Sequence, residues 1–192
     1  MKRILLTLTV MLLSVSVHSA ELGDDGLHKA SWMRDTFKDL SEDLGEAKSE
    51  NKRLLIMVEQ RGCVYCTKMH EEVFVDSEIE AMLENNYFVV QLNLHGDIEV
   101  TDFDGETLSE KDMARKWGIL FTPTLMYITE NVDSRQTARE AAVAVMPGAF
   151  AKGTTLDLMT WVHEKRYSLD IDEDFQRYHA RRIRERGDGL TD

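Results

Sequence analysis

The chain has only two cysteines, Cys63 and Cys66, and they are separated by two residues. An apolar run, residues 54–58, precedes them and is typical of a buried strand. A strand that leads into a C-x-x-C pair favours thiol–disulfide exchange, in which one thiolate attacks a disulfide and the second thiol completes the transfer. We therefore expect Cys63 and Cys66 to form a redox-active pair.

Other uses of the cysteine pair fit the sequence less well. A structural disulfide across two intervening residues closes almost no loop, so it removes little entropy from the unfolded chain. A closed zinc site needs about four ligands. His70 shares the expected helix face with both cysteines, but no fourth ligand is evident. A c-type haem needs a histidine where Thr67 stands. We expect neither a metal nor a cofactor.

Residues 1–20 have the features of a secretory signal peptide. Lys2 and Arg3 form the positive end, residues 4–13 are almost wholly apolar, and small residues follow before a cleavage point after Ser19 or Ala20. The apolar run is short for a membrane span, although an uncleaved anchor stays open. We expect export to the periplasm, and in an oxidising compartment a thiol pair tends to become a disulfide.

The charge and the length limit the class of protein further. The net charge is −12, and loss of Lys2 and Arg3 with the signal brings it to −14. Such an acidic chain is not expected to bind nucleic acid. A mature length of about 170 residues suits a single domain. We therefore predict a signal peptide at 1–20, one domain at 21–167, a charged C-terminal extension at 168–192, and a monomer.

The hydrophobic pattern predicts alternating helices and strands. Residues 31–49 have apolar side chains at helical spacing, and Ser77 to Glu80 fits a capping box that begins another helix. The other elements expected in the first half are a strand at 54–59, a helix that begins at Cys63, and a buried strand at 87–94. Residues 95–107 are polar, fail the calcium-loop pattern, and are expected to form a solvated loop.

The second half of the chain continues this alternation. Ser109 begins a helix that ends near Gly118. The elements expected after it are strands at 125–128 and 141–146 and a helix capped at Thr154. Apolar residues at Phe175, Tyr178 and Ile183 could dock a further helix, while the basic run 181–184 is expected to be a solvated face. Long crossovers favour a parallel central strand pair and a short connection favours an antiparallel one. The fold class is therefore α/β, a mixed sheet flanked by helices.

This order of elements resembles the thioredoxin family over roughly residues 31–167. The C-x-x-C pair before the first long helix and Thr122-Pro123 before the next-to-last strand carry the likeness. The closer resemblance is to the exported thioredoxins of bacterial sulfur-oxidation gene clusters, the SoxW type. Three segments carry it: residues 62–70, 96–106 and 114–124.

The resemblance implies specific roles. Cys63 would be the exposed attacking thiol and Cys66 the buried resolving thiol. Pro123 would follow a cis bond, face the cysteine pair, and together with Thr122 offer backbone hydrogen bonds to a bound substrate strand. Val64 and Tyr65 lie between the cysteines, where they either contact a partner or fill the first helical turn.

Three positions depart from the thioredoxin pattern. Gly62 replaces the usual tryptophan before the first cysteine, Met57 replaces a buried aspartate, and Gln91 replaces a lysine. The usual aspartate–lysine proton relay is therefore missing. Glu59 either substitutes for it or is a surface residue. His70 is expected at the surface or the edge of the core, rather than as a ligand or base.

Together these observations predict an exported thiol–disulfide oxidoreductase that works as a reductant, and the resemblance to the SoxW type implies a role in sulfur oxidation. Its expected partners are exported proteins that carry disulfides and a membrane or periplasmic thiol that supplies electrons. Two alternatives stay open: a disulfide oxidase or isomerase, and a non-catalytic thioredoxin-fold module for binding or metal delivery.

Overall fold

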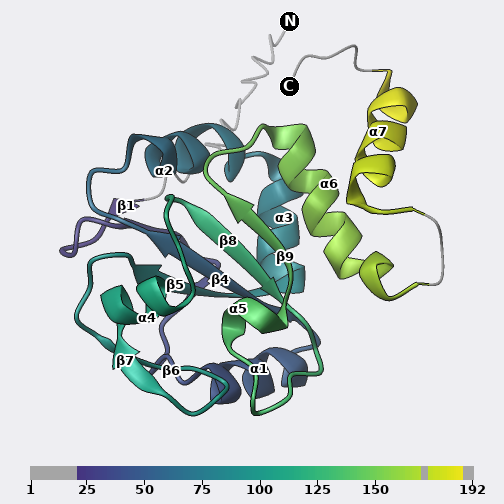
Figure 1. The fold of residues 1–192 in the computed structure, drawn as a ribbon. Helices are drawn as coiled ribbons and strands as arrows, with labels where there is room; N and C mark the ends of the chain where they lie inside the picture. The colour runs from purple at the N-terminus through teal and green to yellow at the C-terminus, as the bar shows by residue number, and fades with distance from the viewer. Residues whose placement is uncertain (1–20, 170–172, 188–192) are drawn as a thin grey trace, which may run out of the picture.

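The structure is a computed structural model that describes residues 21–169 and 173–187 (Figure 1). At its centre lies a five-stranded mixed sheet with the strand order β3-β5-β4-β8-β9. The strands of this sheet are β3 (Met33–Arg34), β4 (Arg53–Glu59), β5 (Tyr87–Asn93), β8 (Thr124–Ile128) and β9 (Ala142–Pro147). Two small antiparallel hairpins lie outside it: β1 (Glu21–Leu22) with β2 (His28–Lys29), and β6 (Glu99–Thr101) with β7 (Thr107–Ser109).

The pairing of the strands confirms the predicted mixed sheet. β4 and β5 are parallel, with Met57 opposite Gln91, while β8 is antiparallel to both β4 and β9. β4 is buried along its whole length, which explains the unbroken apolar run in the sequence. The loop after β4 therefore starts from the rigid middle of the sheet, and this loop carries the first cysteine.

Helices cover both faces of the sheet (Figure 1). The helices are α1 (Leu40–Ser49), α2 (Val64–Lys68) continued by the π-helical turn η1 (Met69–Val73), α3 (Ser77–Asn86), α4 (Glu110–Lys116), α5 (Ala138–Ala141), α6 (Lys152–His163), the 3-10 turn η2 (Arg166–Ser168) and α7 (Phe175–Arg186). One core lies between the sheet and α1, α4 and α5. The other lies between the sheet and η1, α3, α6 and α7. Alternate residues of β4 serve the two cores, with Ile56 in the first and Met57 in the second.

The helix predicted over 31–49 is wrong in its first half. Met33 lies in the edge strand β3, opposite Val89 of β5. Lys38 has a φ of 59°, a left-handed conformation that no helix can pass through. Asp39 then caps α1 by accepting hydrogen bonds from the first backbone N–H groups of the helix. The helical spacing of Trp32 and Phe37 was therefore fortuitous, since Trp32 is buried and Phe37 is 97% exposed.

Two other helix starts differ from their predictions. Asp76, not Ser77, caps α3, and its carboxylate accepts from the N–H of Glu78. α6 begins at Lys152 after Ala151, without a side-chain cap, so Thr154 lies inside the helix. The start of α4 is confirmed, because the Ser109 hydroxyl accepts from the N–H of Asp112.

The segment predicted as a solvated loop at 95–107 is in part the β6–β7 hairpin, and its Asp102 is buried. The Asp102 carboxylate accepts from the indole N–H of Trp117 at 2.8 Å and from the N–H of Ala138 at 2.8 Å. It also pairs with the ammonium group of Lys116 at 3.0 Å. One carboxylate therefore ties the hairpin to the end of α4 and to the start of α5.

The charged C-terminal extension docks in part as the helix α7, which lies along α6 (Figure 1). Tyr178 is buried in the core beneath α7. Asp157 of α6 is fully buried and accepts from His179 at 2.7 Å and from Arg186 at 2.7 Å. The cations around this carboxylate stabilise its charged form and hold its pKa below the ordinary value, against the opposing effect of burial.

The predicted signal peptide, residues 1–20, lies outside the described residues, as do residues 170–172 and 188–192. Within the described part of the chain, no helix combines the length and the apolar content that crossing a bilayer requires.

Replacing Asp102 tests its role as an anchor. We expect Asp102→Ala to lower the free energy of unfolding by about 3 kcal/mol, because it leaves buried N–H donors without a partner and Lys116 without its buried counter-ion. Asp104→Ala is the matched control: it removes an exposed carboxylate from the same Lys116 and should cost less than about 1 kcal/mol. Urea denaturation followed by circular dichroism measures both values, and equal losses would contradict the assignment.

Candidate active site

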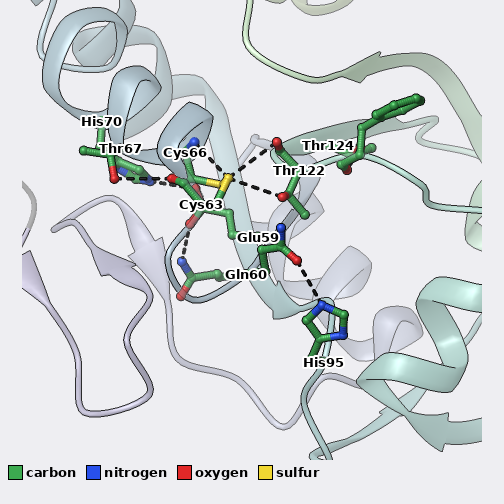
Figure 2. Close-up of a disulfide and its surroundings, with 11 residues drawn as sticks. Glu59, Gln60, Cys63, Cys66, Thr67, His70, His95, Thr122 and Thr124 are labelled. Atoms are coloured by element: carbon green, nitrogen blue, oxygen red, sulfur yellow. Dashed lines mark hydrogen bonds and ion pairs between the residues drawn. A yellow bond between two sulfur atoms is a disulfide. The ribbon is translucent and has the colours of Figure 1, made fainter.

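The cysteine pair lies at the N-terminus of α2, directly beyond the end of β4 (Figure 2). The chain turns at Gly62, whose φ of 71° suits glycine far better than any residue with a side chain. Cys63 is the N-cap of α2, and Cys66 lies in its first turn. The two sulfur atoms are joined in a disulfide. The predicted pair therefore forms, on the first turn of a helix held by the central strand.

Three polar atoms approach the sulfur of Cys63 (Figure 2). The N–H of Cys66 donates to it at 3.0 Å, and the hydroxyl of Thr122 donates at 3.3 Å. The carbonyl oxygen of Thr122 lies 3.5 Å from the same sulfur. In the reduced protein the two donors favour the thiolate, which is the form that attacks a disulfide.

The two cysteines differ in exposure, but less than the resemblance implied. Cys66 has no exposed surface, while Cys63 is 6% exposed. Cys63 is thus the more accessible end of the disulfide, although it is a largely covered residue rather than an exposed one. Thr122, which lies against its sulfur, is itself 8% exposed and covers part of it.

The Thr122–Pro123 peptide bond is cis, as the resemblance implied, and the loop that carries it is anchored at both ends. On one side, Trp117 at the end of α4 is held by Asp102. On the other, the carbonyl of Pro123 accepts from the N–H of Gly148 at 2.7 Å. The Pro123 carbonyl is therefore already engaged within the fold, and Thr122 is the residue of the pair that faces the sulfur.

Four exposed apolar residues adjoin, in sequence, either the cysteines or Thr122, which contacts Cys63, and half of them were not predicted. Val64 is 77% exposed and Tyr65 is 64% exposed, so they do not fill the interior of the helical turn. Leu120 and Phe121, just before the cis bond, are 80% and 61% exposed. We call these four residues the apolar rim. Exposed large apolar side chains that gather around a reactive group mark a docking surface for a partner. Leu120 and Phe121 were not predicted to be part of the rim, although the sequence shows them as an apolar pair directly before Thr122-Pro123.

A buried polar cluster lies behind the cysteine pair. Glu59, the last residue of β4, is 1% exposed and accepts from the amide of Gln91 at 2.7 Å. Its other oxygen lies 3.0 Å from Nε2 of His70, which is 2% exposed. The ring of His28 stacks on that of His70 with centroids 4.5 Å apart. Glu59 is therefore not a surface residue, and His70 lies inside the protein rather than at its edge.

Burial sets the charge of His28 within this cluster. Desolvation lowers the pKa of His28, with a further decrease from the positive charge that His70 can carry. The carboxylate of Glu59 opposes this effect. His28 is therefore a neutral imidazole at pH 7, and a neutral imidazole can accept a proton or bind a metal through a ring nitrogen.

The sequence matches the thioredoxin-like domain family over residues 40–139, a segment that contains the cysteine pair, the cis bond and the central strands. The chain belongs to the thioredoxin-like domain family. A search of curated protein sequences returned no match.

Solved structures agree with this family at the level of the fold. A thioredoxin-fold protein from Helicobacter pylori is similar with a TM-score of 0.53 and 14% identity, over 85% of this chain and 93% of that one. A thioredoxin from Thermus thermophilus is similar with a TM-score of 0.50 and 17% identity, over 65% of this chain and 83% of that one. A thioredoxin-like fold that carries a C-x-x-C pair supports a thiol–disulfide oxidoreductase.

The cationic side chains near the C-x-x-C pair of this thioredoxin-like protein bind groups other than its sulfur atoms. Arg61 donates to the backbone carbonyls of Asp24 and Asp25, not to a sulfur. Lys68 is exposed and pairs with Glu72. The sulfur of Cys63 therefore depends on the N–H of Cys66 and the hydroxyl of Thr122 for its stabilisation.

Removing the Thr122 hydroxyl tests this dependence. In the reduced protein, we expect Thr122→Val to move the pH midpoint of Cys63 alkylation upward by about one half to one unit, because the thiolate loses a donor. Thr67→Val is the matched control, since its hydroxyl donates to the Cys63 carbonyl and not to a sulfur. Iodoacetamide rates measured from pH 5 to 10 give the midpoint. An unchanged midpoint in Thr122→Val would refute the role of the hydroxyl.

Proposed function

We propose that this protein is an exported reductant of protein disulfides. The observation that carries the proposal is the position of Cys63, the accessible end of the disulfide, against Thr122 and within the apolar rim. A reductant of this kind needs one attacking sulfur that a partner can reach and a second sulfur that is protected from solvent. Cys63 is the more accessible of the two, with 6% of its surface exposed, and Cys66 is fully buried.

The reaction we propose consists of two exchanges. The Cys63 thiolate attacks one sulfur of a partner disulfide, the partner's S–S bond breaks, and its other sulfur leaves as a thiolate that takes up a proton. The Cys66 thiol then gives up its proton and attacks Cys63. The mixed disulfide breaks, and the partner's second sulfur leaves as a thiol. The partner gains two electrons, and this protein ends in the Cys63–Cys66 disulfide state of the structure.

The apolar rim supports a protein as the substrate. Val64 and Tyr65 on α2 and Leu120 and Phe121 before the cis bond are all exposed, although burying them on docking would be favourable. Backbone groups of Thr122, with Val64 and Tyr65, are the contacts we propose for the partner. The net charge of −12 argues against nucleic acid as that partner.

The apparent signal peptide supports a periplasmic location, where exported disulfide proteins are the available substrates. A membrane or periplasmic dithiol must then reduce the Cys63–Cys66 bond after each cycle. The motif resemblance at residues 62–70, 96–106 and 114–124 favours carrier proteins of sulfur oxidation as substrates, and we propose that the protein acts as a monomer.

Serine variants test the division of labour between the cysteines. We expect Cys63→Ser to abolish the reduction of insulin disulfides by dithiothreitol, because no attacking sulfur remains. Cys66→Ser should also lose turnover, and once dithiothreitol is removed it should accumulate a mixed disulfide with a partner, since no second cysteine resolves the bond at Cys63. Non-reducing gels followed by mass spectrometry identify the trapped protein. Trapping by Cys63→Ser but not by Cys66→Ser would reverse the assignment. Wild-type protein without turnover would favour a binding module.

The equilibrium potential tests the direction of transfer. We expect the Cys63–Cys66 couple to lie below that of glutathione, near the range of reducing thioredoxins, about −270 mV. Equilibration with glutathione redox buffers, followed by alkylation of the free thiols, measures it. A more oxidising value, close to the roughly −120 mV of a strong periplasmic oxidant, would favour a disulfide oxidase instead.

A further inference from the structure

Three polar side chains from separate segments meet beside the redox helix. His28 comes from the N-terminal hairpin strand β2, Glu59 from the end of β4, and His70 from η1. One ligand atom from each lies within 4.8 Å of the other two.

We propose that His28, Glu59 and His70 bind one divalent cation of the zinc class. Two imidazoles and one carboxylate are a ligand set that zinc uses in proteins, with further positions left to water.

The first argument is the charge of Glu59. Its carboxylate is 1% exposed, and its two oxygens contact His70 and the amide of Gln91. Lys29 donates to Gln91 and not to the carboxylate. Among the ion pairs of the described residues, none joins Glu59 to a lysine or an arginine. A buried carboxylate without a permanent counter-charge is costly, and a bound cation would supply that charge.

The second argument is that one ring nitrogen of His70 is buried without a hydrogen-bond partner among the described residues. Nε2 contacts Glu59, but Nδ1 is buried and has no hydrogen-bond partner among the described residues. A buried network that is only partly satisfied destabilises the fold. A cation bound at Nδ1 would complete the network and leave the contact between Nε2 and Glu59 in place.

Neighbouring side chains hold Glu59 and His70 in place, while the side chain of His28 is free to change its orientation. Gln91 fixes the Glu59 carboxylate and also donates to the carbonyl of His28, as partners behind metal ligands do. His70 is packed against the rings of Trp32 and Phe74. His28 is only half-buried, so it provides both a path of entry and a ring that can turn.

Binding requires a definite movement of His28. Coordination at 2.0–2.1 Å places tetrahedral ligand atoms about 3.4 Å apart. The ligand atoms of His28, Glu59 and His70 lie within 4.8 Å of one another, so they must come closer together to bind one ion. The His28 and His70 rings are stacked, with an interplanar angle of 12°. Stacked rings cannot direct their lone pairs at one ion, so we expect the His28 ring to turn away from the stack on binding.

The site is distinct from the two sulfurs. Its ligands are nitrogen and oxygen atoms, and the proposal holds while Cys63 and Cys66 are joined in a disulfide. Binding to the oxidised protein therefore separates this site from any zinc bound by free thiolates. It also makes the proposal independent of whether the protein reduces disulfides.

Zinc titration of the oxidised full chain tests the proposal. We expect isothermal titration calorimetry at pH 7.5 to show one equivalent of Zn²⁺ bound, and His28→Gln to weaken binding at least about tenfold. His95→Gln is the matched control, because His95 is exposed and contacts Gln60 outside the cluster. It should bind zinc as the wild type does.

Cobalt gives a second readout. Co²⁺ in the oxidised protein should show visible d–d absorption without the ultraviolet charge-transfer bands of thiolate ligands, and His28→Gln should lose the visible bands. Glu59→Gln, checked for folding by circular dichroism, should lose zinc binding as well. The proposal is overturned if the oxidised wild type binds no stoichiometric zinc, or if His28→Gln binds it as tightly as His95→Gln.

Discussion

The contact between Cys63 and Thr122 is the constraint on which the site depends. It joins residues 59 positions apart in the chain, through the sulfur of one and the hydroxyl and carbonyl of the other. β4 places the first residue and β8 the second, and these strands are antiparallel neighbours in the sheet. The sheet order therefore decides which loop faces the disulfide. A C-x-x-C helix without that neighbour would lack one of its two donors and half of its apolar rim.

Polar groups well away from the sulfurs maintain this arrangement. Asp102 holds Trp117, and Trp117 precedes the loop that carries the cis bond. Gly148 holds the other side of that loop through the carbonyl of Pro123. Buried, fully paired carboxylates are uncommon and cost much to disrupt. Asp102 thus serves the active site without touching it, and the polar appearance of its segment in the sequence conceals this role.

The position behind the disulfide separates this protein from the familiar thioredoxin pattern. Met57 and Gln91 replace the aspartate and lysine of that pattern, and they lie opposite each other in the β4–β5 pair. Glu59 lies two residues further along β4 on the same face and is buried with His70 and His28. The acidic group has moved toward the end of the strand, and its partners are imidazoles and an amide rather than a lysine.

The sequence alone determined the reactive pair, the mixed sheet and the strand context, because these depend on local spacing and hydrophobic period. Predictions from the sequence were wrong where the local preference of a segment competes with its tertiary contacts. The period over 31–49 suggested one helix, but strand pairing at Met33 and the left-handed backbone at Lys38 exclude its first half, and the helix begins only at Leu40. The burial of Glu59, His70 and Asp102 and the exposure of Leu120 and Phe121 follow from the three-dimensional fold. The environment of a side chain depends on segments that are distant in sequence. A local pattern carries no information about which of those segments will lie beside it.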